Sequence, residues 1–294
     1  MSDVAAMSPP KGRPRSAAAR KFKNRLFEVF MWTTGVIALV PLVLIVGYVL
    51  VKGIPALSVD FFTQTAPAPG VPGGGMQQAI VGSAMIVGMA VLISVPLGIM
   101  TAIYLSEYGR GKLASATRFV AEILLSTPSI VAGAFIWAVV VTAMHSFSAI
   151  AAAIALSVLM WPIITRGAEE TLRLVPDDLR EAALALGVPR WRVVSSIVLP
   201  TAGPGIFTVV MLSIARGLGE TAPVLLTALG NDFLNLDPRL PTDAIPLRIY
   251  NYAQSAVIEW HDLAWGGAIV LLVVVLTLSV GARILSDRQQ RRLR

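Results

Sequence analysis

Long apolar segments alternate with short polar connections along most of the chain. A helix that crosses the hydrocarbon layer of a bilayer needs about 20 mostly apolar residues. Segments that meet this requirement cover roughly residues 29–51, 77–104, 119–143, 147–165, 205–228 and 263–285. The pattern predicts an all-α polytopic membrane protein with six transmembrane helices.

The basic residues lie mainly on one side of this pattern. Only Lys52, Arg239 and Arg248 fall in the outward connections, and Arg216 lies within a span. The other 20 of the 24 lysines and arginines lie in the two tails, at the end of the sixth span and in the connections after the second and fourth spans. Because cytoplasmic connections are enriched in Lys and Arg, both termini are expected to be cytoplasmic. The expected organisation is a basic tail, a six-helix domain and a second basic tail, over residues 1–28, 29–285 and 286–294.

Composition excludes several classes of function. Charged residues make up 14% of the chain, against about 25% in soluble domains. The net charge of +7 comes from clusters between apolar segments and not from a groove with interleaved aromatic residues, so no nucleic-acid partner is expected. With no cysteine and two histidines, neither a disulfide framework nor a thiolate metal site is expected. No GxxxxGKS, GxxxxGKT, HExxH or GxSxG motif occurs, so we expect that the chain is not an enzyme.

The connection after the fourth span, residues 166–204, is long and has a helical pattern. Apolar residues recur with helical spacing at Leu179, Ala182, Ala183 and Leu186. Pro176 and two aspartates supply a helix start, Gly187 a stop, and Pro189 the start of a second helix. The pattern predicts a helix, a turn and a second helix. Composition alone also permits two amphipathic helices that lie on the lipid surface.

The residue spacing in this connection resembles a known motif. Glu181, Ala182 and Ala183 are followed after three residues by Gly187, and after nine more by an Ile-x-Leu-Pro sequence. This spacing resembles the EAA loop of ABC importer permeases. The resemblance implies that Glu181, Ala182, Ala183 and Gly187 form coupling helices that dock into a groove on a separate ATPase subunit. Small alanines allow close helix approach, Gly187 allows a sharp turn, and Glu181 can pair with a basic residue of a partner.

The fifth span carries two charged residues at membrane depth. Arg216 and Glu220 are one helical turn apart. A central arginine costs about 2.5 to 3.5 kcal/mol on insertion scales, so Arg216 is a functional-site hypothesis with Glu220 as its partner. A guanidinium can bind two phosphate oxygens at once, which favours an anion pathway. The alternative is an ion pair within the helix, or a bridge to a second subunit, that fixes packing without touching cargo.

The sequence around Arg216 resembles one importer family. The segment ARGLGETAP, residues 215–223, is similar to the equivalent segment of PstA-type phosphate permeases, as are residues 74–83 and 249–252. The similarity covers nearly all six spans. It implies a type I ABC importer permease (MetI-like) architecture, with inorganic phosphate as cargo and Arg216 and Glu220 in its pathway.

The same resemblance implies the partners and the compartment. The partners are a PstC-type permease subunit, a PstB-type ATPase dimer that uses ATP, an extracytoplasmic PstS-type phosphate-binding protein and membrane lipid. The chain itself would bind no cofactor directly and would be a multi-pass protein of the bacterial inner (plasma) membrane. An importer of another oxyanion is the nearest alternative, because the coupling loop does not specify the solute. A secondary transporter would also suit intramembrane charges, but the EAA-like loop argues against it.

Other polar positions are expected to be structural. Glu107 and Glu122 are expected near the cytoplasmic interface and not as cargo ligands. Pro128, beside hydroxyl residues of the third span, and Pro162 in the fourth each predict a local kink. Residues 66–75 are rich in proline and glycine, which predicts an irregular outer loop.

Overall fold

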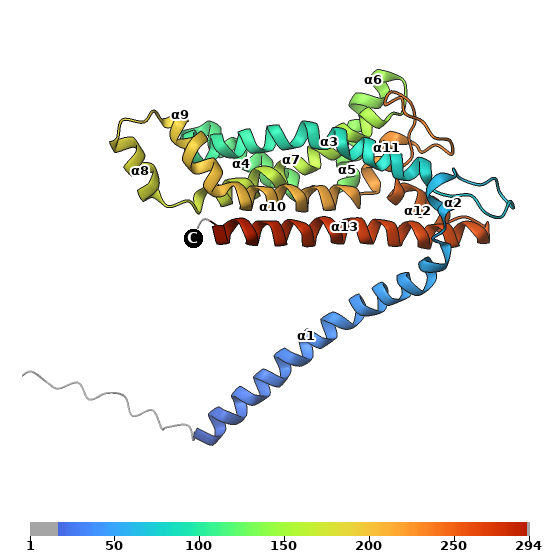
Figure 1. Cartoon of the computed structure of the whole chain (residues 1–294), viewed down its shortest axis with the longest axis horizontal. Coiled ribbons are helices and arrows are strands. Elements are labelled where there is room, and N and C mark those ends of the chain that lie inside the picture. The colour runs from blue at the N-terminus through green and yellow to red at the C-terminus, as the bar shows by residue number, and fades with distance from the viewer. Residues whose placement is uncertain (1–16, 293–294) are drawn as a thin grey trace, which may run out of the picture. The chain divides into compact units, whose positions relative to one another are not determined.

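The computed structural model describes the backbone of residues 17–292 and the side chains of residues 20–286. The chain forms two units, one that ends at Val49 and one that begins at Leu50. Within the described residues, the first unit consists of the larger part of α1 (Ala17–Gly53), a long apolar helix with Pro41 inside it. The remaining helices belong to the second unit (Figure 1).

The second unit is mainly helical. Its helices up to residue 144 are η1 (Ile54–Ala56), α2 (Val59–Thr63), α3 (Gln77–Ile103), η2 (Tyr104–Tyr108), α4 (Gly111–Ser126), α5 (Ser129–Ile136), η3 (Trp137–Val141) and α6 (Thr142–Met144). From residue 149 they are α7 (Ala149–Arg173), α8 (Asp177–Ala185), α9 (Arg190–Val193), η4 (Val194–Val198), α10 (Leu199–Leu218), α11 (Ala222–Ala228), α12 (Ile245–Ala253) and α13 (Ile258–Arg292). Across residues 17–292 the only β pairing is an isolated bridge between Leu229 and Thr242, so the all-α prediction is confirmed.

The apolar segments appear as long helices. Within the described residues, stretches that are long and apolar enough to cross a membrane are Arg20–Ala56, Gln77–Tyr108, Ala149–Arg173, Arg190–Leu218 and Ile258–Ser286. A sixth crossing requires a bent pair, Gly111–Ser126 with Ser129–Met144. These correspond to the six predicted spans, although several helices extend beyond the predicted bounds.

The third predicted span is two helices and not one kinked helix. α4 and α5 meet at an angle of 106°. Thr127 ends α4, and Pro128, which has no amide hydrogen to donate, caps the start of α5. The hydroxyls of Ser126 and Thr127 donate to carbonyl oxygens of the preceding turn, which helps the helix to end there. The proline signal was therefore correct in position, but the bend is far larger than a local kink.

The fifth predicted span, residues 205–228, is also divided. α10 ends at Leu218, and the chain leaves the helix at residues 219–221 before α11 begins. At its other end α10 continues directly from α9 and η4, so one helical stretch runs from Arg190 to Leu218. The predicted connection at residues 166–204 is thus shorter than expected, because α7 extends to Arg173 on one side and α9 begins at Arg190 on the other.

The core is built around α7. This helix packs against both α3 and α10, and its buried face is rich in alanine. Glycines on the neighbouring helices let the backbones approach closely: a Cβ atom added at Gly98 of α3 would lie 2.7 Å from Ile164 of α7. Gly205 of α10 faces Thr171 of α7 in the same way. Close contact through small residues is the usual means by which membrane helices pack, because lipid gives them little hydrophobic reason to associate.

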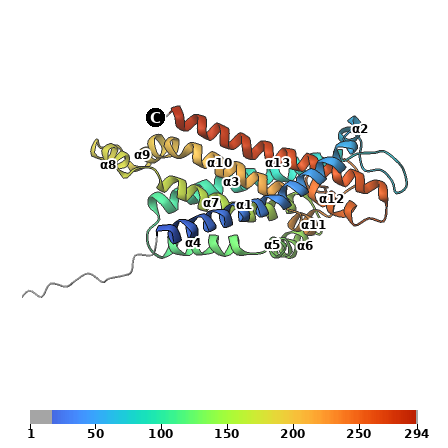
Figure 2. The same cartoon turned by 90° about the horizontal axis from the view of Figure 1, so that it is seen from below.

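The two ends of the second unit differ in character. α8, α9 and the C-terminal part of α13 lie at one end, while α2, α6 and α12 lie at the other (Figures 1 and 2). Residues 64–76 at this second end form no helix, as the proline and glycine content predicted. The α8 end carries the EAA-like sequence, and the α12 end carries the segment between the last two spans.

Candidate functional site

The predicted helix, turn and second helix are present between α7 and α10. α8 begins after Pro176, with two aspartates in its first turn, and ends at Ala185. Gly187 adopts a positive φ of 77°, a conformation that glycine reaches without the steric cost of a side chain. The amide of Val188 then donates to the carbonyl of Ala183 at 3.2 Å, which closes the helix end, and Pro189 caps α9.

The structure divides the four predicted coupling residues between two sides. Glu181, Ala182 and Gly187 are exposed, whereas Ala183 is buried against the core. Large apolar side chains of the same segment are exposed as well: Leu184, Leu186 and Trp191. An exposed apolar patch that also holds a carboxylate is the usual character of a protein docking surface. We call this set, Glu181, Ala182, Leu184, Leu186 and Trp191, the α8 surface.

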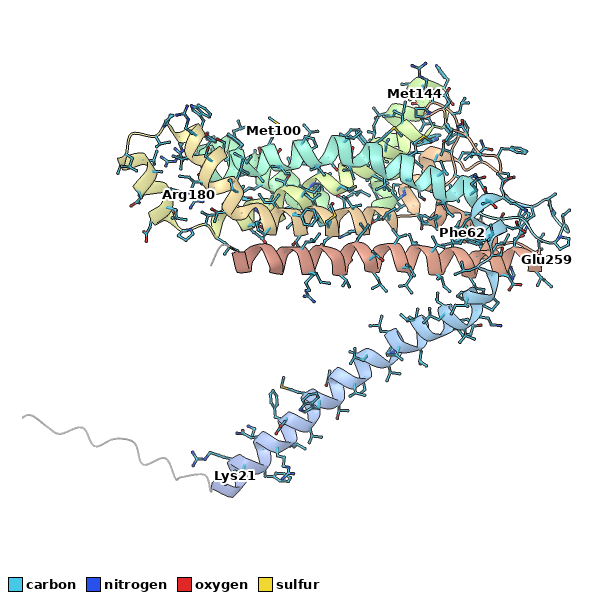
Figure 3. All side chains as sticks on the ribbon, in the orientation of Figure 1. Lys21, Phe62, Met100, Met144, Arg180 and Glu259 are labelled. Atoms are coloured by element: carbon cyan, nitrogen blue, oxygen red, sulfur yellow. The ribbon has the colours of Figure 1, made fainter. Side chains whose placement is uncertain are left out.

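Arg180 fastens α8 to the rest of the unit. Its Nη2 donates to the carboxylate of Glu107 in η2 at 3.0 Å and to the carbonyl of Leu172 in α7 at 2.8 Å. Its Nη1 donates to Asp177 at 2.9 Å and to the carbonyl of Val175. One guanidinium therefore binds carbonyl groups at the C-terminal end of α7 and a carboxylate at the end of the second span. Figure 3 labels Arg180 at this end of the unit.

Glu107 is buried, and one arginine before the Gly187 turn and one after it contact this residue. Its side chain is 6% exposed. Arg180 of α8 reaches its carboxylate, and Arg190 of α9 donates to its backbone carbonyl. The Arg190 guanidinium also lies 5.3 Å from the centre of the Tyr108 ring. The sequence predicted only that Glu107 lies near the cytoplasmic interface and gave no sign of these contacts.

Glu169 in α7 is the second buried carboxylate that sequence analysis missed. It is 1% exposed and accepts from Arg118 of α4 at 2.7 Å, from Arg166 at 3.1 Å and from Arg173 at 2.6 Å. Arg118 also donates to the carbonyl of Leu105 at 2.7 Å. The carboxylate thus joins α7 to α4, and Arg118 extends this link to η2. The only sign of this cluster in the sequence is the number of arginines near the C-terminal end of α7. The enrichment of Lys and Arg in cytoplasmic connections already explains that number.

Arg216 and Glu220 lie beside the break after α10. The Nε of Arg216 is 3.5 Å from a carboxylate oxygen of Glu220, and the two side chains are 63% and 18% exposed. Among the described residues, neither Nη group of Arg216 has a bonded partner. The pair is therefore a loose one, and most of the guanidinium is open to a ligand.

The structure does not bring the Arg216 pair and the α8 surface together. They are joined by the helical stretch from Arg190 to Leu218, which has 29 residues. At 1.5 Å per residue this stretch is about 40 Å long. The start of α9 and the position of Arg216 therefore lie on one helical stretch.

A compact charged cluster lies outside the spans, at the α12 end. Arg248 of α12 donates through Nε to Asp243 at 2.5 Å, through Nη1 to Asp232 at 2.6 Å and through Nη2 to the carbonyl of Asn231 at 2.8 Å. Its guanidinium lies 5.1 Å from the centre of the Tyr252 ring. Arg248 and Asp243 are both buried, and the second carboxylate oxygen of Asp243 has no partner among the described groups. The cluster fixes the segment between α11 and α12.

Burial of Asp243 makes the stability of this segment depend on pH. Burial raises the pKa of the Asp243 carboxyl from 3.8 to about 6, although Arg248 acts in the opposite direction. Because the folded protein holds this proton more tightly, the contribution to stability is complete below about pH 4 and is lost as pH rises to about 6. We expect the unfolding temperature of the native chain, measured relative to Asp243→Asn, to fall over that range. The exposed Asp237→Asn variant should keep the native pH response, and an Asp243→Asn chain that also keeps it would contradict the assignment.

Comparisons with known proteins agree with this architecture. Residues 94–294 match the family of binding-protein-dependent transport system inner membrane components. The phosphate transport system permease protein PstA of Yersinia pestis is 44% identical over 281 residues, which make up 95% of each chain. The phosphate transport system permease protein PstA 1 of Mycobacterium tuberculosis is 39% identical over 280 residues, 94% of this chain and 91% of its own length.

Solved structures show the same fold at low identity. A bacterial alginate ABC transporter, in complex with an alginate pentasaccharide-bound periplasmic protein, gives a TM-score of 0.67 at 16% identity over 93% of this chain and 98% of the matched one. An inward-facing MetNI methionine ABC transporter gives 0.57 at 19% identity over 74% and 97%. The predicted ABC importer permease architecture is confirmed. The chain belongs to the binding-protein-dependent transport system inner membrane components and, within that family, to the PstA permease proteins.

Proposed function

We propose that this chain is the permease subunit of an ATP-driven importer and that inorganic phosphate is its cargo. The observation that carries the proposal is Arg216, an arginine within the chain's apolar spans, in a chain 44% identical to a phosphate permease protein. Neither of its Nη groups has a partner in the part of the chain that the structure describes. A guanidinium with a free edge can donate two parallel hydrogen bonds to one phosphate. Glu220 holds the Nε edge and leaves the other edge open.

The pathway proposal includes both members of the pair. With no cargo present, Glu220 partly neutralises Arg216, which reduces the cost of a charge at membrane depth. When phosphate arrives, it competes for the same guanidinium. An ion pair that only fixes packing within this chain would require tight and buried contacts, and the 3.5 Å separation and the 63% exposure of Arg216 argue against it. The other alternative, a bridge from Arg216 to a second subunit, is distinguished by the uptake of the Arg216→Ala complex.

The coupling proposal rests on the α8 surface. Glu181, Ala182 and the turn at Gly187 are exposed together with apolar side chains at the end of the unit, where a partner can reach them. Ala183 faces inward and sets how closely α8 approaches the core. We assign this surface to a PstB-type ATPase dimer, which would use ATP, so that the permease needs no cofactor of its own.

The remaining partners follow from the same assignment. A PstC-type permease would supply the other half of the pathway, and a PstS-type phosphate-binding protein would deliver cargo at the α12 end. The chain is a multi-pass inner-membrane protein. We place the α8 end and both termini in the cytoplasm, because the connections at that end and the two tails carry most of the basic residues.

Uptake of radiolabelled phosphate by proteoliposomes that contain the four components tests the cargo. The expected result is ATP-dependent accumulation of phosphate that persists in the presence of excess sulfate. Vanadate, which blocks ABC ATPases, should abolish it. Sulfate accumulation in place of phosphate would identify an importer of another oxyanion, and phosphate accumulation that needs no ATP would identify a secondary transporter.

A further inference from the structure

We propose that Glu107 is a positioning residue that couples ATP-driven movement of α8 to the membrane helices. The proposal deepens the coupling role given above and rests on it. Its basis is the junction of Glu107 with Arg180 and Arg190, which we call the Glu107 junction. These two arginines come from opposite sides of the Gly187 turn, yet both bind one residue at the end of the second span.

Three features indicate that the junction has more than a packing role. Glu107 is 6% exposed and the Arg180 side chain is 16% exposed, so their ion pair is largely shielded from water and salt. η2, which holds Glu107, is a single π-helical turn, and such turns are often found at functional sites. Asp177, the other carboxylate bound by Arg180, is 86% exposed and lies on α8 itself, so it cannot connect α8 to another helix.

The second span extends from this junction to the opposite end of the unit. α3 and η2 form one helical stretch of 32 residues, which is about 48 Å long. Near its start, the Ser83 hydroxyl accepts from the amide of Ile245 at 2.8 Å, and Gly82 contacts the backbone of Asp243. The stretch therefore connects Glu107 to the Asp243–Arg248 cluster.

Two long helical stretches thus leave the coupling region. One runs from Arg190 through α10 to the Arg216 pair, and the other runs from Glu107 back through α3 to the outer cluster. The Glu107 junction links these two stretches at the coupling region, because Arg190 begins the α10 stretch and Glu107 lies at the end of the α3 stretch. Movement of α8 and α9 therefore displaces both stretches together. Without the junction, α8 can move with the ATPase while α3 stays behind.

The test compares Glu107→Gln with Asp177→Asn in the assembled transporter. Each change neutralises one carboxylate bound by Arg180, and each preserves side-chain size. For Glu107→Gln we expect normal association with the ATPase and continued ATP hydrolysis, but about a tenfold drop in phosphate imported per ATP hydrolysed, within the usual range of coupling free energies. For Asp177→Asn we expect a ratio within about twofold of the native value, as for an exposed pair.

Two more variants, Arg180→Met and the double variant Glu107→Gln/Arg180→Met, show whether Glu107 and Arg180 act through their shared contact. If they do, the double variant should lose no more coupling than the more affected single variant, because the shared contact is lost only once. Losses of Glu107 and Arg180 that add independently would overturn the proposal. So would a parallel fall in assembly, ATP hydrolysis and uptake, which is the result expected of a residue that only maintains the fold.

A second measurement does not depend on the cargo. Hydrogen exchange of the α8 amides in the assembled complex should become about tenfold faster in Glu107→Gln, because a buried contact that holds the helix has been removed. Unchanged exchange would overturn the proposal whatever solute is transported. Failure of the native complex to import phosphate, with α8 exchange and ATP coupling still sensitive to Glu107, would reject only the phosphate assignment.

Discussion

Replacement of Arg216 by alanine is expected to reduce phosphate uptake by about 100-fold while the transporter still assembles. The size follows from the loss of a charged group that donates hydrogen bonds to an anion, which typically costs 2 kcal/mol or more. The chain should still fold, because the pair with Glu220 is loose at 3.5 Å and the arginine side chain is 63% exposed. Uptake in proteoliposomes, normalised to assembled complex, measures the effect.

Two further variants separate the contributions to this effect. Arg216→Lys keeps the charge but not the planar pair of donors, so uptake should recover only in part. Arg283→Ala removes an exposed arginine from α13, another spanning helix, and should leave uptake close to native. Equal uptake in the native and Arg216→Ala complexes would assign Arg216 to helix packing alone.

The sequence predicted features that depend on local pattern. Apolar length located the spans, and the Pro–Asp–Asp start with the Gly187 stop located α8 to within one residue. Gly187 could be predicted as a turn because its positive φ is a property of one residue. The pairing of Arg216 with Glu220 could be predicted because residues four apart on a helix are neighbours.

Features that depend on distant contacts could not be predicted. Glu107 and Arg180 are 73 residues apart, and Arg118 and Glu169 are 51 apart. Each of these charges already had a sufficient explanation as part of a cytoplasmic connection, so nothing in the pattern marked it as buried. The break at Pro128 was visible as a helix-breaking signal, but the 106° angle depends on where α5 finds its packing partners in α7 and α11.

The buried carboxylate of Glu169 also contributes to the stability of the chain. Its carboxylate is 1% exposed and is shared by three arginines, of which Arg118 and Arg166 are mostly buried and Arg173 is about half exposed. A buried ion cluster of this kind gives little net stability compared with apolar packing, but removal of one member leaves charges without a partner. Among the described residues, the one other carboxylate that pairs with any of these three guanidiniums is Glu122, which lies 3.2 Å from Arg166.

Replacement of Glu169 by glutamine is therefore expected to destabilise the chain by about 3 to 5 kcal/mol. For a chain of this length that loss corresponds to a fall of about 10 °C in unfolding temperature, which size-exclusion analysis of heated, detergent-solubilised protein can measure. Glu170→Gln is the matched control, because the next residue carries the same charge on the same helix but is exposed, and its effect should stay within about 2 °C. If both variants unfold at the same temperature, the arginines must find other partners when Glu169 is lost. The contacts between α4, α7 and η2 would then rest on apolar packing and not on this carboxylate.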